Sequence, residues 1–277
     1  MEKALISIMD WWESAGLETG HSSLDTPAKT QNPSLAGMSK SNKASKNSRS
    51  RGQISQAGKS ASVNTHIDTD ADQSQNIKAR LETAQVVAKQ ASSLGGLQTA
   101  MQAFDAGDIS DHARQCVFAR GNAKADIMLI DTAPDKEDDI QGKPLTGQAG
   151  DLLGKMLHSI GLTDEDVYIT HMVNWRPPEN RAPTQDEINM CRPFLDRHIE
   201  FIAPKIIALI GATPLSALTG ITGIMKNRGQ WQILKANGKE LPALPIFHPA
   251  FLLKRPELKK EAWRDLLALR AKIQTLL

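Results

Sequence analysis

A histidine followed by a proline, apolar side chains and a lysine stands near the carboxyl end of the sequence, at residues 248–254. The segment follows an apolar run, so His248 is expected at a corner where a strand passes into a loop, and the proline after it restricts the backbone. An imidazole held there, followed by Phe251, Leu252 and Lys254, suits a site that enters DNA and extrudes a base. A His-Pro corner also occurs for purely structural reasons, so the loops upstream have to be weighed with it.

Two of those loops have compositions that suit chemistry. Asp131–Asp139 is a proline turn rich in carboxylates directly after an apolar run, and it suits either the activation of a water molecule or simple solvation. Gly142–Gly150 places glycines before an expected helix, where backbone N–H groups can approach a phosphate or a carbonyl-rich ring. This second loop lacks the Lys-Ser/Thr pair of a P-loop, so we do not expect a nucleoside triphosphate there.

Arginines occupy the later loops. Arg176 and Arg181 lie in a proline-rich loop, and Arg228 lies before the last apolar run. Guanidinium groups suit contacts with phosphates. The proline-rich loop is equally explained as a stiff connection that ends in a capping box formed by Thr184 and Glu187.

Strands and helices alternate between these loops. Apolar runs predict strands at 127–130, 167–173, 206–210 and 244–247, and helical patterns fall near 148–160, 184–202, 213–219 and 256–276. Such alternation implies parallel crossovers, with helices on both faces of the sheet. We therefore predict a three-layer α/β/α fold whose site lies at the carboxyl ends of the strands.

Three further segments precede this domain, which we place at 113–277. Residues 1–15 carry apolar residues at helical spacing and are expected to form a short amphipathic helix, which either packs on the domain or docks on a partner protein. Residues 16–75 are polar and more often basic than acidic, and we expect a disordered segment that is either a plain linker or a tether that binds phosphates without specificity. Residues 76–112 are expected to be a helical lead-in, broken at Leu94-Gly95-Gly96.

The composition bears on the surface charge, the membrane contact and the cellular compartment of the protein. The net charge is only +2, so any basic surface must be local. No apolar stretch approaches the roughly 20 residues of a membrane span. Two cysteines cannot form a disulfide framework, which favours the cytoplasm. We expect a cytoplasmic monomer without membrane contact.

Short motifs follow one another from residue 115 to residue 275: Gly121-Asn122, Ala133-Pro134, Asp139–Pro144, Gly147-Gln148-Ala149-Gly150, Tyr168-Ile169-Thr170, Arg176–Pro183, Gly211-Ala212-Thr213, Arg228-Gly229-Gln230-Trp231 and His248–Leu253. In this order and spacing they resemble the family 4 uracil-DNA glycosylases, a bacterial and archaeal branch that usually carries an iron–sulfur cluster. The resemblance implies a central four-stranded parallel sheet, flipping of a base out of DNA, and hydrolysis of the N-glycosidic bond of uracil.

The resemblance also assigns roles to residues. His248 matches the family histidine that stabilises the leaving uracil. The base pocket is expected at Ala133, Pro134, Leu145 and His171. Contacts with DNA are expected from Gly147, Gln148, Gly150, Arg176, Arg181, Arg228, Phe251, Leu252 and Lys254. The expected partner is therefore DNA, with single-stranded DNA as one form of it.

The pocket departs from the family pattern. The family motif Gly-Glu-Ala-Pro-Gly reads Asp-Thr-Ala-Pro-Asp here, so Thr132 replaces the acid linked to water activation and Asp135 replaces a glycine that permits close approach. These two positions remain the candidate catalytic residues beside His248. Leu145 replaces the aromatic that stacks on uracil, a loss of roughly 1–3 kcal/mol per base. His171 replaces an asparagine. The asparagine amide has a donor and an acceptor on adjacent atoms, and an imidazole lacks this pair. These changes predict weak or absent excision of uracil.

The cysteines do not match the family's cluster. Four thiolates are the usual ligands, and this chain has two cysteines. Cys191 matches the last ligand position, Trp175 stands at the third, and Cys116 lies outside the pattern. We predict that no cluster and no other metal is bound, and that Trp175 fills the volume by apolar packing.

Three functions remain open. The chain is an active glycosylase with an altered pocket for uracil or another deaminated base, a catalytically degenerate family member that binds DNA, or a protein-interaction module built on its N-terminal helix. The retained histidine and arginines favour contact with DNA over the third function.

Overall fold

The structure is a computed structural model that describes residues 69–276. The predicted helix at 1–15 and the predicted linker up to residue 68 lie outside the described residues. None of the helices within 69–276 is both long enough and apolar enough to cross a membrane.

Three helices precede the sheet: α2 (Thr69–Gln90), α3 (Leu94–Gln102) and α4 (Asp108–His112). Because α2 begins at Thr69, the last residues of the predicted linker are helical, and the boundary at residue 75 is wrong. The predicted break between two helices is present, but it lies at residues 91–93, and Leu94-Gly95-Gly96 form the first turn of α3. The Ser93 hydroxyl accepts a hydrogen bond from the Gly96 N–H at 3.1 Å and caps that turn.

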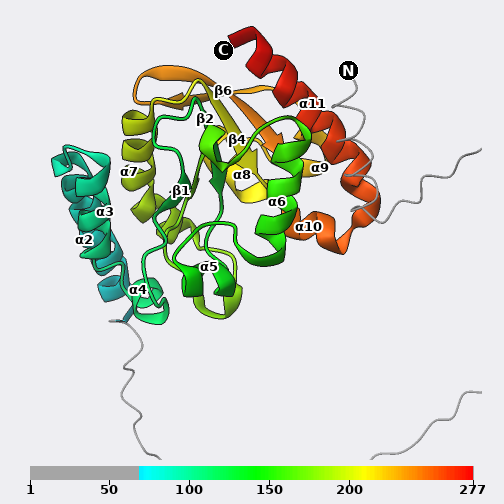
Figure 1. Ribbon diagram of the computed structural model, residues 1–277. Helices are drawn as coiled ribbons and strands as arrows, with labels where there is room; N and C mark the ends of the chain where they lie inside the picture. The colour runs from blue at the N-terminus through cyan, green and yellow to red at the C-terminus, as the bar shows by residue number, and fades with distance from the viewer. Residues whose placement is uncertain (1–68, 277) are drawn as a thin grey trace, which may run out of the picture. The chain divides into compact units, whose positions relative to one another are not determined.

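A six-stranded sheet forms the centre of the fold, in the order β1-β3-β2-β4-β6-β5 (Figure 1). Its strands are β1 (Ala119–Gly121), β2 (Ile127–Asp131), β3 (Val167–His171), β4 (Ile206–Ile210), β5 (Gln232–Ala236) and β6 (Lys239–Ile246). β3, β2, β4 and β6 are parallel, which confirms the predicted four-stranded parallel sheet. β1 and β5 add an antiparallel strand at each edge, and the sequence analysis predicted neither.

Helices follow the strands as expected. α6 (Gly147–Ser159), α7 (Gln185–Ile202), α8 (Ala212–Thr219) and α11 (Lys259–Leu276) confirm the four predicted helices. The shorter helices are α5 (Lys136–Gln141), α9 (Ile224–Asn227) and α10 (Pro249–Lys254), with single 3-10 turns η1 (Asp164–Asp166), η2 (Pro178–Asn180) and η3 (Pro256–Leu258). The Thr184 hydroxyl and the Glu187 carboxylate form the predicted capping box of α7.

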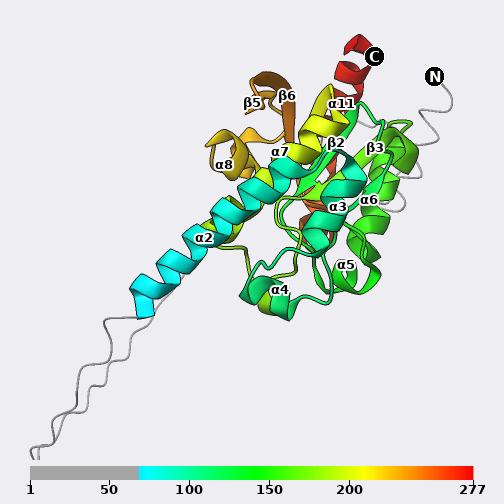
Figure 2. The same cartoon turned by 90° about the vertical axis from the view of Figure 1, so that its left-hand side faces the viewer.

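Alternate residues of the central strands face opposite layers. Met128 and Ile130 pack in one apolar cluster with α2, α3, α7 and α8, while Ile127 and Leu129 pack in another with α6, α10 and α11. Figure 2 shows α2 lying along α7 on the first of these faces. The predicted three-layer α/β/α arrangement is confirmed, and it leaves the carboxyl ends of the strands as the edge where polar side chains gather.

Candidate active site

The ends of three parallel strands bring two imidazoles and a carboxylate together. Asp131 ends β2 and His171 ends β3, and these two residues are partners in the register of the sheet. His248 follows β6, two strands away from β2. Gly211, which follows the intervening β4, has a φ of 92° and turns the chain away beside the Cβ of His248. The imidazole of His248 therefore reaches across the end of β4 to Asp131.

His248 is fixed through both ring nitrogens. Nδ1 accepts a hydrogen bond from the Ala250 N–H at 3.0 Å, because His248 caps α10 and Pro249 occupies its first position. Nε2 lies 3.3 Å from the Asp131 carboxylate. Burial lowers the pKa of His248, but Asp131, with smaller contributions from Asp138 and Asp135, outweighs burial and raises it above its usual value.

His171 is enclosed between two carboxylates. Its side chain is 0% exposed, and Nε2 lies 3.6 Å from Asp131 Oδ2 and 3.5 Å from Asp138 Oδ2. Burial raises the pKa of Asp138, but His171 and two hydrogen bonds donated by Thr146, at 2.6 and 2.7 Å, bring it down to about 2. Two carboxylates of the protein itself therefore face the imidazole at the predicted base-reading position.

Asp131 and Asp138 are functional candidates that the sequence analysis did not single out. Both lie in the carboxylate-rich segment whose chemistry was recognised as a whole. Only the register of Asp131 with His171, and the approach of Asp138 to the same imidazole at 3.5 Å, distinguish them from their neighbours. Position at the end of a strand was the available signal for Asp131.

The predicted catalytic residues Thr132 and Asp135 lie in the same turn. The Asp135 carboxylate is exposed and accepts hydrogen bonds from the N–H groups of Glu137 and Asp138 at 2.8 and 3.0 Å, so it caps α5. Thr132 is half-buried, and its carbonyl accepts a hydrogen bond from the Val173 N–H at 3.1 Å.

The predicted base-pocket residues surround this turn. Ala133 is half-buried and Pro134 is buried. Leu145 is 2% exposed, has a φ of 54°, and its carbonyl accepts a hydrogen bond from Arg120 at 2.8 Å. The structure brings these residues together with His171 around the end of β2.

The predicted glycine-rich contact with DNA forms the start of α6. Gln148 is exposed and Gly147 is half-buried. Gly150 is buried, and a Cβ at this position would lie 2.0 Å from the Leu145 carbonyl oxygen. Gly150 is thus required for the packing of its own loop.

The three predicted arginine contacts have different environments. Arg181 is partly exposed and forms a bidentate pair with Glu187 at 2.6 and 2.8 Å. Arg176 donates to the Asn180 side chain at 2.6 Å. Arg228 is largely buried against Asp265, with 2.9 Å between Nη1 and Oδ1.

The predicted DNA-entering segment is the helix α10. Phe251 is half-buried against Phe247, with ring centroids 5.4 Å apart, and Lys254 is exposed. Leu252 is 0% exposed, so its side chain faces the core in this structure, and its contact with DNA stays a prediction. Leu253, which is 39% exposed, is the apolar side chain that α10 presents to solvent.

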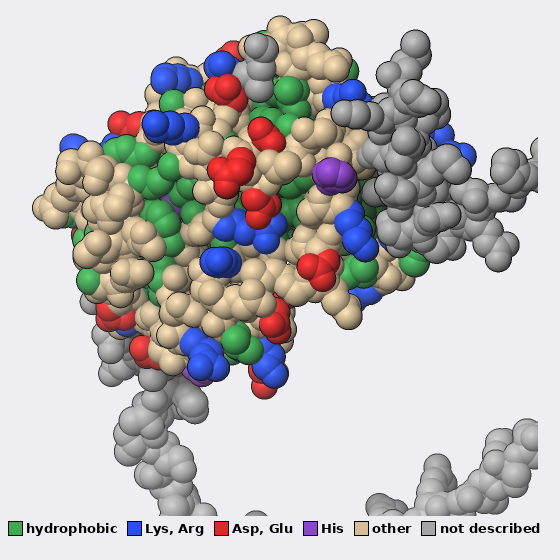
Figure 3. Space-filling view, in the orientation of Figure 1, with side chains coloured by type: hydrophobic (Ala, Val, Ile, Leu, Met, Phe, Trp, Pro, Cys, Tyr) green, Lys and Arg blue, Asp and Glu red, His purple; other side chains and the backbone are tan. Residues whose placement is uncertain are grey.

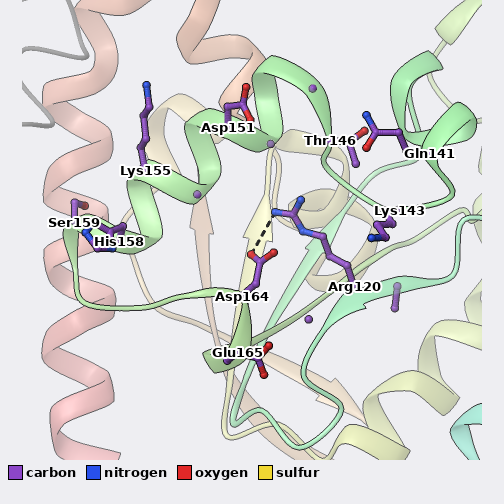
Figure 4. A pocket seen from close by; sticks show the side chains of 15 residues that line it. Arg120, Gln141, Lys143, Thr146, Asp151, Lys155, His158, Ser159, Asp164 and Glu165 are labelled. Carbon is purple, nitrogen blue, oxygen red and sulfur yellow. Dashed lines mark ion pairs between the residues drawn. The ribbon is translucent and has the colours of Figure 1, made fainter.

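A separate hollow of about 1040 Å³ lies between α6, β1 and η1 (Figure 4). Its charged lining mixes Arg120, Lys143 and Lys155 with three carboxylates, and Arg120 forms an ion pair with Asp164 at 3.6 Å. Figure 3 likewise shows side chains of both signs interspersed on this face. The hollow shares Thr146 with the surroundings of Asp138, but it has no excess of cations to attract phosphates.

The residues at the cluster position do not fit an iron–sulfur cluster. Trp175 is 3% exposed and packs against Phe104 and Phe194, with ring centroids 6.0 and 6.4 Å away, as the predicted apolar filling. Burial raises the pKa of Cys116 and of Cys191, and these are the two cysteines of the chain, whereas the cluster needs four thiolate ligands.

Comparison with known proteins identifies the class to which this fold and site belong. The sequence profile described as the Uracil DNA glycosylase superfamily matches residues 118–267, which is more than half of the chain. The matched span includes all three strand ends and the segment that carries His248.

Individual relatives narrow the class. The type-4 uracil-DNA glycosylase of Archaeoglobus fulgidus is 39% identical over 150 residues, 52% of this chain and 75% of the relative. That of Saccharolobus solfataricus is 39% identical over 175 residues, 57% of this chain and 81% of the relative. That of Sulfurisphaera tokodaii is 41% identical over 150 residues, 52% of this chain and 68% of the relative. The chain therefore belongs to the uracil DNA glycosylase superfamily, and within it to the type-4 family.

Proposed function

We propose that this chain is a uracil-DNA glycosylase, a DNA repair enzyme that hydrolyses the bond between a flipped base and its deoxyribose. Family membership supports the reaction class. The observation that carries the proposal is His248, whose Nε2 is held at the carboxyl ends of the strands by the N–H of Ala250 and the carboxylate of Asp131.

The chemistry requires a donor for the departing base. As the glycosidic bond breaks, the sugar gains positive charge and the base leaves as an anion. A hydrogen bond donated by His248 to the base oxygen strengthens as that charge develops, and it lowers the barrier more than it stabilises the bound substrate. Asp131 is the buried carboxylate nearest to this donor.

We propose that the excised base is uracil or another deaminated base, read differently from the family pattern. Leu145 offers apolar contact without aromatic stacking. His171 lies 3.6 Å from Asp131 and 3.5 Å from Asp138, and its imidazole has no donor and acceptor on adjacent atoms. Both differences lead us to expect slow excision of uracil.

The substrate is DNA, and we propose that flipping is easiest from single strands, where less stacking is lost. Phosphate contacts are proposed for Arg176, Arg181 and Lys254, which lie near the strand ends, and for Arg228 after release from Asp265.

We propose a monomer that works in the cytoplasm. The division of the chain into a docking helix at 1–15, a linker that now ends before Thr69, a helical lead-in and a catalytic domain also remains a proposal.

A glycosylase assay tests the function. Single- and double-stranded oligonucleotides that carry uracil, hypoxanthine or xanthine are incubated with the full chain, and abasic sites are cleaved with alkali. We expect cleavage with at least one base and a loss of about 10²–10³-fold in His248→Ala. His112→Ala is the matched control, because His112 is exposed and its Nδ1 contacts only the Asp108 carbonyl. Equal activity of His248→Ala and the wild type would remove His248 from the chemistry.

A second candidate, a family member that binds DNA without turnover, is favoured by the burial of His171 and Leu145. It predicts salt-dependent binding in the absence of cleavage with every base. Arg181→Ala should lower the salt slope by about 1. Arg192→Ala, which breaks a similar pair with Asp196 on α7, should leave the slope unchanged.

A further inference from the structure

We propose that Asp131 is a positioning residue, whose carboxylate holds His248 with its proton on Nε2 and its ring directed at the strand ends. The proposal deepens the function above and rests on the role given there to His248.

The tautomer follows from the contacts of the ring. The Ala250 N–H can only donate, so Nδ1 of His248 must accept, and in the neutral ring the single proton is then on Nε2. Nε2 faces both oxygens of Asp131 at 3.3 Å. Asp131 accepts this proton without competition from any other hydrogen bond to its side chain within residues 76–276.

Because Asp131 is buried, its carboxylate depends on the imidazoles beside it. The Asp131 side chain is 2% exposed, and a buried carboxylate without a partner costs several kcal/mol. Its nearest cations or donors are the two imidazoles, Nε2 of His248 at 3.3 Å and Nε2 of His171 at 3.6 Å. Asp131 is therefore stable in this position only beside the imidazoles. Rotation of His248 away from it would remove the nearer of the two and leave the His171 imidazole at 3.6 Å.

Other charged groups also face this pair. Asp135 and Asp138 approach from the start of α5, and His171 approaches from β3. Asp131, Asp138 and Asp135 all raise the pKa of His248, since each carboxylate favours its protonated imidazole. Asp131 is the largest of these contributions, so its removal should affect His248 more than removal of Asp138.

Nitrogen NMR of the full chain tests the proposal without reference to activity. The chain has seven histidines, and the His248 signals are assigned as those missing from His248→Gln. At a pH above the raised pKa of His248, we expect a neutral wild-type ring with its proton on Nε2. Asp131→Asn should lower the pKa of His248 by about one unit or more, and Asp138→Asn by less. Asp126→Asn is the matched control, because Asp126 lies at the other end of β2 and pairs with Lys205 at 3.2 Å.

Each outcome has a defined meaning. A neutral wild-type ring with its proton on Nδ1, or an unchanged pKa of His248 in Asp131→Asn, would overturn the proposal. If Asp131→Asn does not fold, the tautomer of His248 in the wild type still tests the proposal. A lowered pKa in a chain that excises no base would retain the pair and reject the glycosylase function. Excision of a base together with an unchanged pKa of His248 in Asp131→Asn would retain the glycosylase function and reject the pair. In an active chain, Asp131→Asn should also shift the acid limb of the pH–rate profile to lower pH, because the neutral ring is the form that Ala250 and Asp131 position.

Discussion

Two residues that differ from the family motifs, Asp131 and His171, are neighbours in space. They are partners in the register of β2 and β3, with 3.6 Å between Asp131 Oδ2 and His171 Nε2. They belong to one buried group with His248 and Asp138, so replacing either of them changes the polar neighbours of the others. The altered pocket is therefore a coupled arrangement rather than a set of independent losses.

This coupling changes the design of a variant with a restored pocket. We expect weak excision of uracil by the unmodified chain, and a gain of about 10²-fold or more when the family residues are restored together. The variant combines Asp131→Gly, Thr132→Glu, Asp135→Gly, Leu145→Phe and His171→Asn, and it is assayed on single-stranded DNA that contains uracil.

Two further variants complete that experiment. The same set without Asp131→Gly should gain less, because Asp131 then loses His171 while still engaging His248. Adding His248→Ala to the full set should abolish the gain. Robust excision by the unmodified chain would contradict the prediction and assign catalytic roles to the residues now present.

At the scale of elements, the start of α6 depends on one glycine. A Cβ on Gly150 would lie 2.0 Å from the Leu145 carbonyl oxygen, whereas a Cβ on Gly154, one turn later, would contact nothing within 4 Å. We expect Gly150→Ala to destabilise the fold by about 1–3 kcal/mol or more through overpacking. Gly154→Ala should stabilise it by about 0.5–1 kcal/mol because alanine favours a helix. Urea denaturation measures both, and similar effects of the two changes would refute this account of the turn.

The attachment of α11 is expected to depend on pH. Burial, helped by Glu261, raises the pKa of Asp265 to about 7, although Arg228 lowers it. Because this pKa exceeds the unfolded value of about 3.9, folding favours the protonated acid. Its stabilising contribution is complete below the unfolded pKa and is lost as the pH rises through about 7.

Asp265→Asn removes this dependence. Its free energy of unfolding relative to the wild type should rise between about pH 5 and about pH 8, as measured by urea denaturation. Asp126→Asn, on the surface, should follow the wild-type curve. A constant difference between Asp265→Asn and the wild type would show that the acid does not titrate in this range.

At the scale of the whole molecule, we expect apolar packing to take the place of metal ligation. Trp175, Phe104 and Phe194 join α3 to α7 in the larger apolar cluster. We expect purified protein to lack the visible absorbance of an iron–sulfur cluster and to keep its urea midpoint in a chelator. Trp175→Ala should cost about 3–5 kcal/mol. Stoichiometric iron with visible absorbance would contradict this prediction.

The sequence alone determined the four parallel strands of the sheet and the longer helices that cover it. The four apolar runs and the four longer helices were found because hydrophobic periodicity is a local property of the chain. The placement of His248 at a strand-to-loop corner followed from the same pattern. The two edge strands were missed because β1 is three residues long and only half-buried, and β5 is interrupted by exposed side chains.

Tertiary structure decided which side chains meet. The pairing of Asp131 with His171 depends on strand order and register, and the pairing of Arg228 with Asp265 joins positions 37 residues apart. Only the rotation of α10 decided that Leu252 is buried while Leu253 is exposed. These outcomes depend on contacts between distant segments, whose geometry is set when the layers pack and is not encoded in any local pattern.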